Sequence, residues 1–162
     1  MHFAVSPETA HQAAALGPIR VRSNRALFIA IAILAVAGIL VSAVSLQRHY
    51  AKSASAFCEF GEKFNCDIVN RSEYSTVIGI PVAGIGVVGY GVLLALATAY
   101  RTRAETPLRL LAAAGAGLAF ALYLTYIEGR VLEAWCILCL SSLGLIALIT
   151  ALSAVVKVRE ER

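Results

Sequence analysis

The chain has 162 residues, of which 59% are hydrophobic and 15% are charged, and its net charge at pH 7 is +4. Soluble domains contain about 45–50% apolar and about 25% charged residues, so this composition argues against a soluble domain and indicates a membrane protein. Nucleic-acid binding is disfavoured as well, because the basic residues lie in short clusters between apolar runs and form no continuous patch.

The first 25 residues carry no hydrophobic pattern. Pro7, Gly17 and Pro18 interrupt helices, so we expect residues 1–25 to form a mobile cytoplasmic tail. The apolar run that follows is longer than the core of a cleaved signal peptide, which spans about 7–15 residues. The sequence therefore predicts a tail followed by a retained membrane helix.

Four long apolar stretches follow the tail, over residues 26–46, 77–100, 110–127 and 134–156. A helix needs about 20 apolar residues to cross a hydrocarbon core of about 30 Å, and a single apolar segment in lipid must satisfy its own backbone as a helix. The sequence predicts an all-α membrane protein, a four-transmembrane-helix bundle over residues 26–156 with a short cytoplasmic tail over 157–162. Glycines recur in the second and third stretches, and we expect nearly all of them to let helices pack closely.

The basic residues predict the orientation of the bundle. Nine of them flank the stretches on the side of the termini, and five lie on the other side. By the positive-inside rule, both termini face the cytoplasm of a multi-pass protein in the cytoplasmic (inner) membrane. Residues 50–76 and the short turn 128–133 then face the periplasm or its equivalent. His49 is expected to be an interfacial residue, and Glu128 and Glu133 are expected to be solvated.

All four cysteines fall on this predicted outer side. Cys58 and Cys66 lie in the loop after the first helix, and Cys136 and Cys139 form a Cys-x-x-Cys at the start of the fourth helix. A helix N-terminus favours the thiolate, so we expect the pKa of Cys136 to be lowered. Cys139 lies roughly 4.5 Å deeper along the axis. Two pairs at one membrane face indicate a thiol–disulfide relay between a soluble protein and the bilayer.

Two other uses of the four cysteines stay open. Structural zinc is less favoured, because one pair is widely spaced and the other begins a membrane helix; no metal site is predicted. Two static disulfides would make the protein a disulfide-stabilised membrane scaffold that is not an enzyme.

The residues around the second loop cysteine resemble bacterial members of the vitamin K epoxide reductase family. The run from Cys66 through Ser72, the Gly79-Ile80-Pro81 that opens the second helix and the Cys-x-x-Cys of the fourth helix occur in the order typical of this family. The resemblance covers about residues 26–156. The Dsb-type quinone reductases have their two cysteine pairs in the reverse order.

The resemblance implies a quinone-dependent thiol–disulfide oxidoreductase that supports disulfide bond formation. Cys58 would meet a thioredoxin-like protein of the DsbA type, Cys66 would exchange with Cys136, and Cys139 would reduce a membrane quinone, ubiquinone or menaquinone. Ser72 matches the loop serine near the quinone pocket of the family. Because the chain ends six residues past the fourth helix, we expect the partner to be a separate protein.

Two positions depart from the animal members of the family. Leu143 stands where those relatives carry a tyrosine, and Val82 where they carry an asparagine; both are polar partners of the quinone in them. These departures disfavour the alternative of a reductase of vitamin K epoxide itself. They leave polar contacts with the quinone to Ser72, the backbone or water.

Overall fold

The computed structural model describes residues 7–51, 64–103 and 105–161, and for residues 7–23 it describes the backbone only. Four helices dominate the fold: α1 (Pro7–Tyr50), α3 (Val82–Thr98), α4 (Thr106–Ile127) and α5 (Ile137–Glu161). Between α1 and α3 lie the short helix α2 (Cys66–Asn70), the 3₁₀ turn η1 (Glu73–Ser75) and the two-residue strands β1 (Thr76–Val77) and β2 (Ile80–Pro81). A π-helical turn, η2 (Glu128–Leu132), ends α4.

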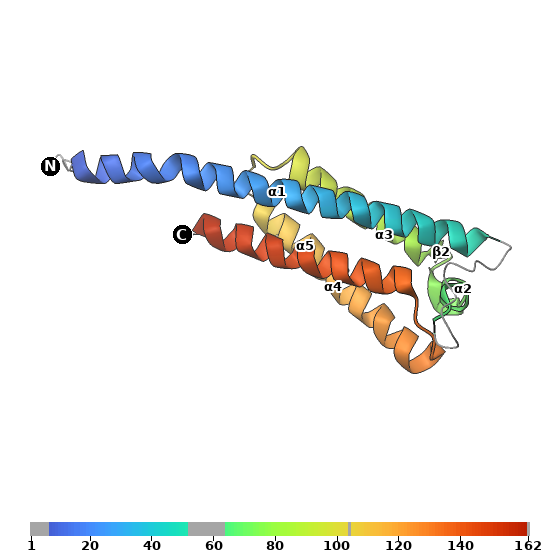
Figure 1. The fold of residues 1–162 in the computed structure, drawn as a ribbon. Helices are drawn as coiled ribbons and strands as arrows, with labels where there is room; N and C mark the ends of the chain where they lie inside the picture. Colours follow the sequence, from blue (N-terminus) through green and yellow to red (C-terminus); the bar gives the residue numbers. More distant parts are fainter. Residues whose placement is uncertain (1–6, 52–63, 104, 162) are drawn as a thin grey trace.

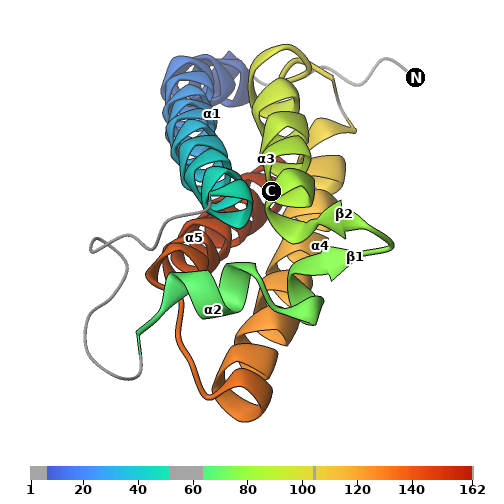
Figure 2. The same cartoon turned by 90° about the vertical axis from the view of Figure 1, so that its right-hand side faces the viewer.

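The four helices form a closed ring. α1 packs against α3 and α5, and α4 packs against the same two helices. Both termini lie at one end of the bundle, while α2 and the β1–β2 hairpin lie at the other (Figure 1). Seen from that second end, α2 and the hairpin lie across the ends of the helices (Figure 2). We call the two ends the terminal end and the cysteine end.

The terminal half of the bundle holds the hydrophobic core. Its fully buried side chains come from all four helices and include Ile31, Ala97, Leu110 and Val156. α1 and α3 pack tightly at Gly38, where an added Cβ would lie 2.4 Å from the Tyr90 ring. This contact requires glycine, since any larger residue would overlap the ring.

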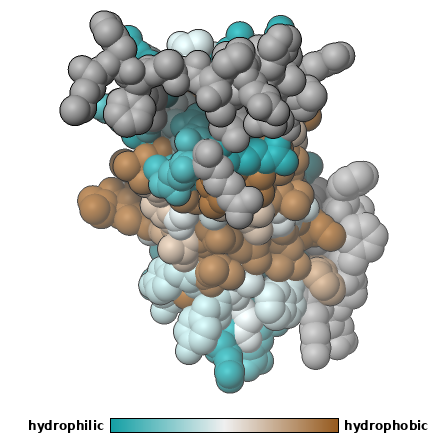
Figure 3. All heavy atoms as spheres, turned by 90° about the vertical axis from the view of Figure 1, so that its left-hand side faces the viewer, coloured by the Kyte–Doolittle hydropathy of each residue, from teal (hydrophilic) through white to brown (hydrophobic). Residues whose placement is uncertain are grey.

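Large apolar side chains also cover the outside of the bundle. Ile33, Leu40 and Val88 are each more than 60% exposed. In a view of the terminal end, hydrophobic side chains form a broad band across the molecule with hydrophilic ones above and below (Figure 3). Exposed apolar surface on this scale is stable in lipid, not in water. The all-α membrane fold predicted from the sequence is confirmed.

Within the residues that the structure describes, three helical segments have the length and composition of membrane spans, namely Asn24–Tyr50, Thr106–Leu132 and Ile137–Glu161. The second predicted span is shorter than expected, because only the 17 residues of α3 are helical. Ile78 and Gly79 have positive φ and turn the chain into the hairpin, and Pro81 stands before the first helical residue. Proline lacks an N–H and disfavours helix in the residue before it, so the helix starts after it.

The helix α1 extends much further toward the N-terminus than predicted. It starts at Pro7 and continues through Gly17 and Pro18, so the expectation that these residues break any helix is wrong. The alanines before them favour helix, and a helix that propagates from the membrane segment needs no new nucleus. α1 and α5 also pass without a break over the predicted domain boundaries near residues 25 and 157.

Candidate active site

Two backbone segments meet at the cysteine end and bring their cysteines together. Phe64 and Trp135 form a parallel β-bridge, and the Asn65 N–H donates to the Trp135 carbonyl at 3.1 Å. Cys66 directly follows Asn65 in the chain, and Cys136 directly follows Trp135, so this hydrogen bond brings the two cysteines close together. The Asn65 side chain also caps α2, because its Oδ1 accepts the N–H groups of two residues in the first turn, Asp67 at 3.0 Å and Ile68 at 3.1 Å.

Three thiols form a buried cluster at this point. Cys66 and Cys136 are completely buried, and Cys139 is half-buried. The Cys136 side chain is hydrogen-bonded to both Cys66 and Cys139. Apolar side chains surround them, from Val69, Leu132, Ala134 and Leu138. The structure thus brings together three of the four predicted cysteines, and Cys58 lies outside the described residues.

The expected lowering of the Cys136 pKa is wrong for this arrangement. Cys136 does stand at the start of α5, since its carbonyl accepts the Leu140 N–H at 3.0 Å. A backbone hydrogen bond from Cys139 also favours the thiolate. The side-chain hydrogen bond with Cys139, together with burial, outweighs these effects and raises the pKa of Cys136. The reduced cluster therefore holds Cys136 as a thiol.

Glu128 belongs to this cluster, contrary to the prediction that it is solvated. Its side chain is only 2% exposed. One carboxyl oxygen, Oε2, accepts the Cys136 N–H at 3.1 Å, and the side chain is also hydrogen-bonded to Cys139. The π-helical turn brings the end of α4 back toward the start of α5, where Trp135 packs against Gly129. Glu133, the other predicted solvated residue, is exposed.

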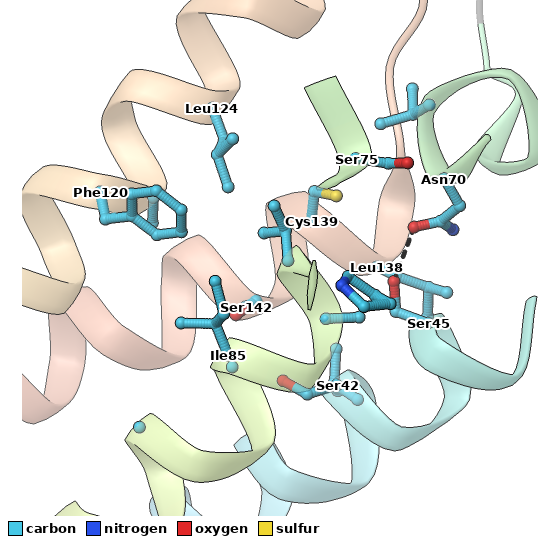
Figure 4. A pocket seen from close by; sticks show the side chains of 18 of the residues that line it. Ser42, Ser45, Asn70, Ser75, Ile85, Phe120, Leu124, Leu138, Cys139 and Ser142 are labelled. Carbon is cyan, nitrogen blue, oxygen red and sulfur yellow. Dashed lines mark hydrogen bonds between the residues drawn. The ribbon is translucent and has the colours of Figure 1, made fainter. Parts of the chain in front are cut away.

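A cavity of about 220 Å³ lies between the four helices in the cysteine half. Most of its wall is apolar, and it includes Val82 and Phe120. Figure 4 shows the Cys139 sulfur between Phe120 and Leu124 of α4 on one side and Asn70 and Ser45 on the other. Cys139 therefore connects the thiol cluster with the cavity.

One side of the cavity is polar. The Ser45 hydroxyl donates to Asn70 Oδ1 at 2.8 Å, and His49 Nδ1 lies 2.5 Å from the Asn70 carbonyl oxygen. These bonds leave Asn70 Nδ2 buried without an acceptor among the described residues. Such a group is costly to bury unless a ligand accepts its hydrogen bond.

Ser72, the predicted ligand-binding serine, also lines the cavity. Its hydroxyl donates to the Val69 carbonyl at 2.8 Å, so its proton is already in use within the loop. Tyr90 lines the cavity as well and donates to the Ser142 carbonyl at 2.8 Å. Leu143 does not line it within the described residues.

Sequence reasoning missed Glu128, Asn70 and the cavity role of His49. Glu128 sits where an apolar stretch meets a turn, which is also the usual place of a solvated carboxylate. Asn70 lies inside the run that carries the family resemblance, four residues after Cys66. The signal available in the sequence was a polar side chain directly after the apolar pair Ile68 and Val69.

Comparison with known families supports the same assignment. The sequence profile of the vitamin K epoxide reductase family matches residues 29–154. The match covers most of the chain and includes all four cysteines, the cavity, the whole of α3 and α4, and parts of α1 and α5.

Proposed function

Since the chain belongs to the vitamin K epoxide reductase family, whose members are membrane oxidoreductases that generally use a quinone, we propose that it transfers electrons from a thioredoxin-like protein to a membrane quinone. The observation that carries this proposal is the continuity of the site. Three thiols lead from the loop side at Cys66 to the cavity wall at Cys139, and Cys136 between them is hydrogen-bonded to both. The protein would then support disulfide bond formation in the proteins that its partner oxidises.

The residues of the cavity fit a quinone head group. The wall is mostly apolar, as a ring system requires, and Asn70 Nδ2 is a buried donor with no acceptor of its own in the described part of the chain. Asn70 would donate to a quinone oxygen, and Phe120 and Leu124 would contact the ring. The quinone, ubiquinone or menaquinone, supplies the acceptor for two electrons. The protein supplies the dithiol.

The thiols act in the order in which they touch. The partner's dithiol reduces the Cys58–Cys66 disulfide, becomes oxidised itself and releases Cys66 as a thiolate. Cys66 then attacks Cys136 in the Cys136–Cys139 disulfide; the Cys66–Cys136 bond forms, the Cys136–Cys139 bond breaks, and the electron pair stays on Cys139. Cys58 then attacks Cys66, so the Cys58–Cys66 bond forms again and Cys136 leaves with its electron pair, and the Cys-x-x-Cys is left as a dithiol. Cys139 faces the cavity, where this dithiol would give two electrons to the acceptor as the Cys136–Cys139 bond forms again.

The charges at the two ends support an orientation. The described residues of the terminal end include a cluster of arginines, with Arg101 and Arg103 between α3 and α4 and Arg109 in the first turn of α4. By the positive-inside rule we infer that this end faces the cytoplasm and the thiols face the periplasm or exterior. A reporter fused after Arg162 is expected to report cytoplasm and one inserted near Ser55 the outer side. The opposite result would leave the thiols in a reducing compartment, where oxidation of a partner fails.

The function is tested by reconstitution. The purified protein in lipid nanodiscs, mixed with a reduced DsbA-type protein and either ubiquinone or menaquinone, is expected to oxidise the partner and form one quinol for each disulfide. If the four cysteines keep one redox state with and without quinone, the protein is a scaffold and the proposal is wrong.

A further inference from the structure

The Glu128 carboxyl lies against the two thiols of the Cys-x-x-Cys. It accepts the Cys136 N–H at 3.1 Å and is hydrogen-bonded to the Cys139 side chain. It also lines the cavity that Cys139 faces. A group that contacts the reacting sulfur and the ligand space at once is placed to act on both.

No cation balances this carboxyl within the described residues. The ion pairs found there are Arg109–Glu105 and Lys157–Glu161, both toward the terminal end. A carboxylate and a thiolate in contact inside a buried site would repel each other, so the pair Glu128–Cys139 carries at most one negative charge at a time. Proton position and the state of Cys139 are therefore linked.

We propose that Glu128 is a catalytic proton donor and acceptor for Cys139, an inference that rests on the proposed function. When the Cys66 thiolate attacks Cys136, the Cys136–Cys139 bond breaks and its electron pair moves to Cys139. The Glu128 carboxyl gives its proton to that sulfur, so a thiol and a carboxylate result and charge is conserved. In the reverse exchange Glu128 takes the proton back, and Cys139 attacks Cys136 as a thiolate.

This arrangement removes the main obstacle to disulfide exchange in a buried site. A thiolate leaving group has little hydration there, and its basicity opposes bond cleavage. A proton supplied within hydrogen-bond reach is typically worth a factor of roughly 10²–10⁴ in rate. The carboxyl is suited to this purpose because the other sulfur it lies against, Cys136, is part of a disulfide before and after the step and has no proton to give.

Other titratable groups surround the pair and enter any pH profile. The neighbours on α2, α5 and the cavity wall are Cys66, Asp67, Cys136, His49, Tyr74 and Tyr90. A pH profile alone would mix their contributions, so the test follows the carboxyl itself.

The first arm of the test is turnover. Glu128→Gln preserves the acceptor for the Cys136 N–H and removes the exchangeable proton, and Glu133→Gln, in an exposed position of the same turn, is the matched control. We expect Glu128→Gln to lower quinone-dependent turnover roughly 100-fold, Glu128→Asp to lower it less, and Glu133→Gln to leave it unchanged. Turnover of Glu128→Gln equal to wild type overturns the proposal.

The second arm needs neither quinone nor partner. Infrared difference spectra of the wild-type protein, taken before and after reduction of its disulfides with a small phosphine, are expected to show loss of one carboxylic-acid band. The same loss on reduction should be seen in Glu133→Gln. In Glu128→Asp the lost band should lie at a different frequency, and in Glu128→Gln no such loss should occur. A wild-type spectrum without this band overturns the proton exchange even if Glu128→Gln fails to fold.

The two arms separate the two proposals. If the band responds to reduction but the wild-type protein does not oxidise a dithiol protein with quinone, the proposed function fails and the Glu128–Cys139 proton exchange stands. If wild-type turnover is normal and the band is absent, the function stands and the role of Glu128 is wrong.

Discussion

The terminal half and the cysteine half of the bundle are stabilised by different interactions. In the terminal half, apolar side chains of all four helices fill the interior, as the burial of Ile31, Leu110 and Val156 shows. In the cysteine half the same helices surround a cavity, and α2 is fixed by a short β-bridge and polar contacts such as Ser45–Asn70. Tyr90 lies at the border, with its ring against Gly38 and its hydroxyl on Ser142.

This difference shows how one small bundle combines rigidity with chemistry. Close packing stabilises the half that performs no chemistry, because every buried apolar group there contributes to folding. The other half gives up part of that contribution to leave room for a ligand. Substitutions in the two halves should therefore affect different measurements, activity in one and unfolding in the other.

The largest expected effect is on activity and comes from Cys139→Ser. In this variant Cys136 has no disulfide partner in its own helix, so it attacks Cys66 in the Cys58–Cys66 disulfide; the Cys66–Cys136 bond forms and Cys58 leaves as a thiol. No Cys139 thiol remains to break the new bond, so that link should accumulate while quinone reduction stops. Peptide mapping without reduction measures the link. Serine is nearly isosteric, so the free energy of unfolding should change little.

Two outcomes would contradict this prediction. Recovery of a Cys58–Cys66 bond with Cys136 free would reverse the order of transfer, and surviving turnover would remove Cys139 as electron donor. Ser141→Ala, in the same turn of α5 but exposed, serves as the control and should keep full turnover.

A selective loss is expected from Cys58→Ser. Oxidation of a protein partner should stop, whereas quinone reduction by a small dithiol should partly persist, because a small molecule reaches Cys136 without the loop. Parallel assays with the protein and the small dithiol measure the ratio. Equal loss in both assays would count against a shuttle function of the loop.

Asn70→Ala should weaken quinone binding. Loss of one donor to the ligand, worth about 1 kcal/mol, raises the KM for quinone roughly five- to tenfold with a smaller change in kcat. Steady-state kinetics in nanodiscs measure the two constants separately. Glu73→Ala, exposed in the neighbouring turn, is the control, and an unchanged KM in Asn70→Ala would leave the buried amide without a ligand.

The pH dependence of Cys136 follows from the direction of its shift. The folded protein raises the pKa of this thiol, so at a given pH it holds less thiolate than a free cysteine, whose pKa is about 8.5. The rate of alkylation of Cys136 should be low and should still increase above that pH. Cys139→Ala should move the plot of alkylation rate against pH to lower pH, because it removes the hydrogen bond with Cys139, the largest cause of the raised pKa. The thiol's contribution to stability is present below about pH 8.5 and is lost as the pH rises further. An alkylation rate that already reaches its maximum below about pH 8.5 would contradict this prediction and would mean that the helix N-terminus lowers the pKa of Cys136, as the sequence suggested.

The smallest effects separate two glycines near the border between the two halves, one tightly packed and one with free space around it. Gly38→Ala should lower the free energy of unfolding by about 1–3 kcal/mol, because its Cβ overlaps the Tyr90 ring. Gly91→Ala is the matched control, since an added Cβ there meets nothing within 4 Å, and better helix propensity should stabilise it slightly. Equal unfolding of both variants in increasing denaturant would mean that α1 and α3 do not rely on this contact.

Local sequence patterns were sufficient for the presence of the four long helices, though not for the starts of α1 and α3, and for the grouping of Cys66, Cys136 and Cys139 at one end. Apolar runs and arginine positions predict those features directly, since lipid imposes them on each segment separately. They could not predict Glu128, because its contacts depend on a π-helical turn that brings two helix ends together. The glycine expectation is confirmed only in part. An added Cβ would meet Ser42 at Gly86 and Ile146 at Gly117, but it would meet nothing within 4 Å at Gly84, Gly89, Gly91 and Gly115. The tightest glycine contact is that of Gly38, in the first stretch.

We expect the short helix α3, the second membrane span predicted from the sequence, to affect the surrounding lipid. Its 17 residues rise about 25 Å, some 5 Å less than a typical hydrocarbon core. The hairpin that completes the span exposes Ile78 and Ile80, and its Pro81 lines the cavity. Hydrophobic mismatch is relieved by local thinning of the bilayer, at a cost that grows with membrane thickness. The thickness of the host membrane thus acts on the same wall that encloses the ligand space, and lipid composition becomes part of the environment of the site.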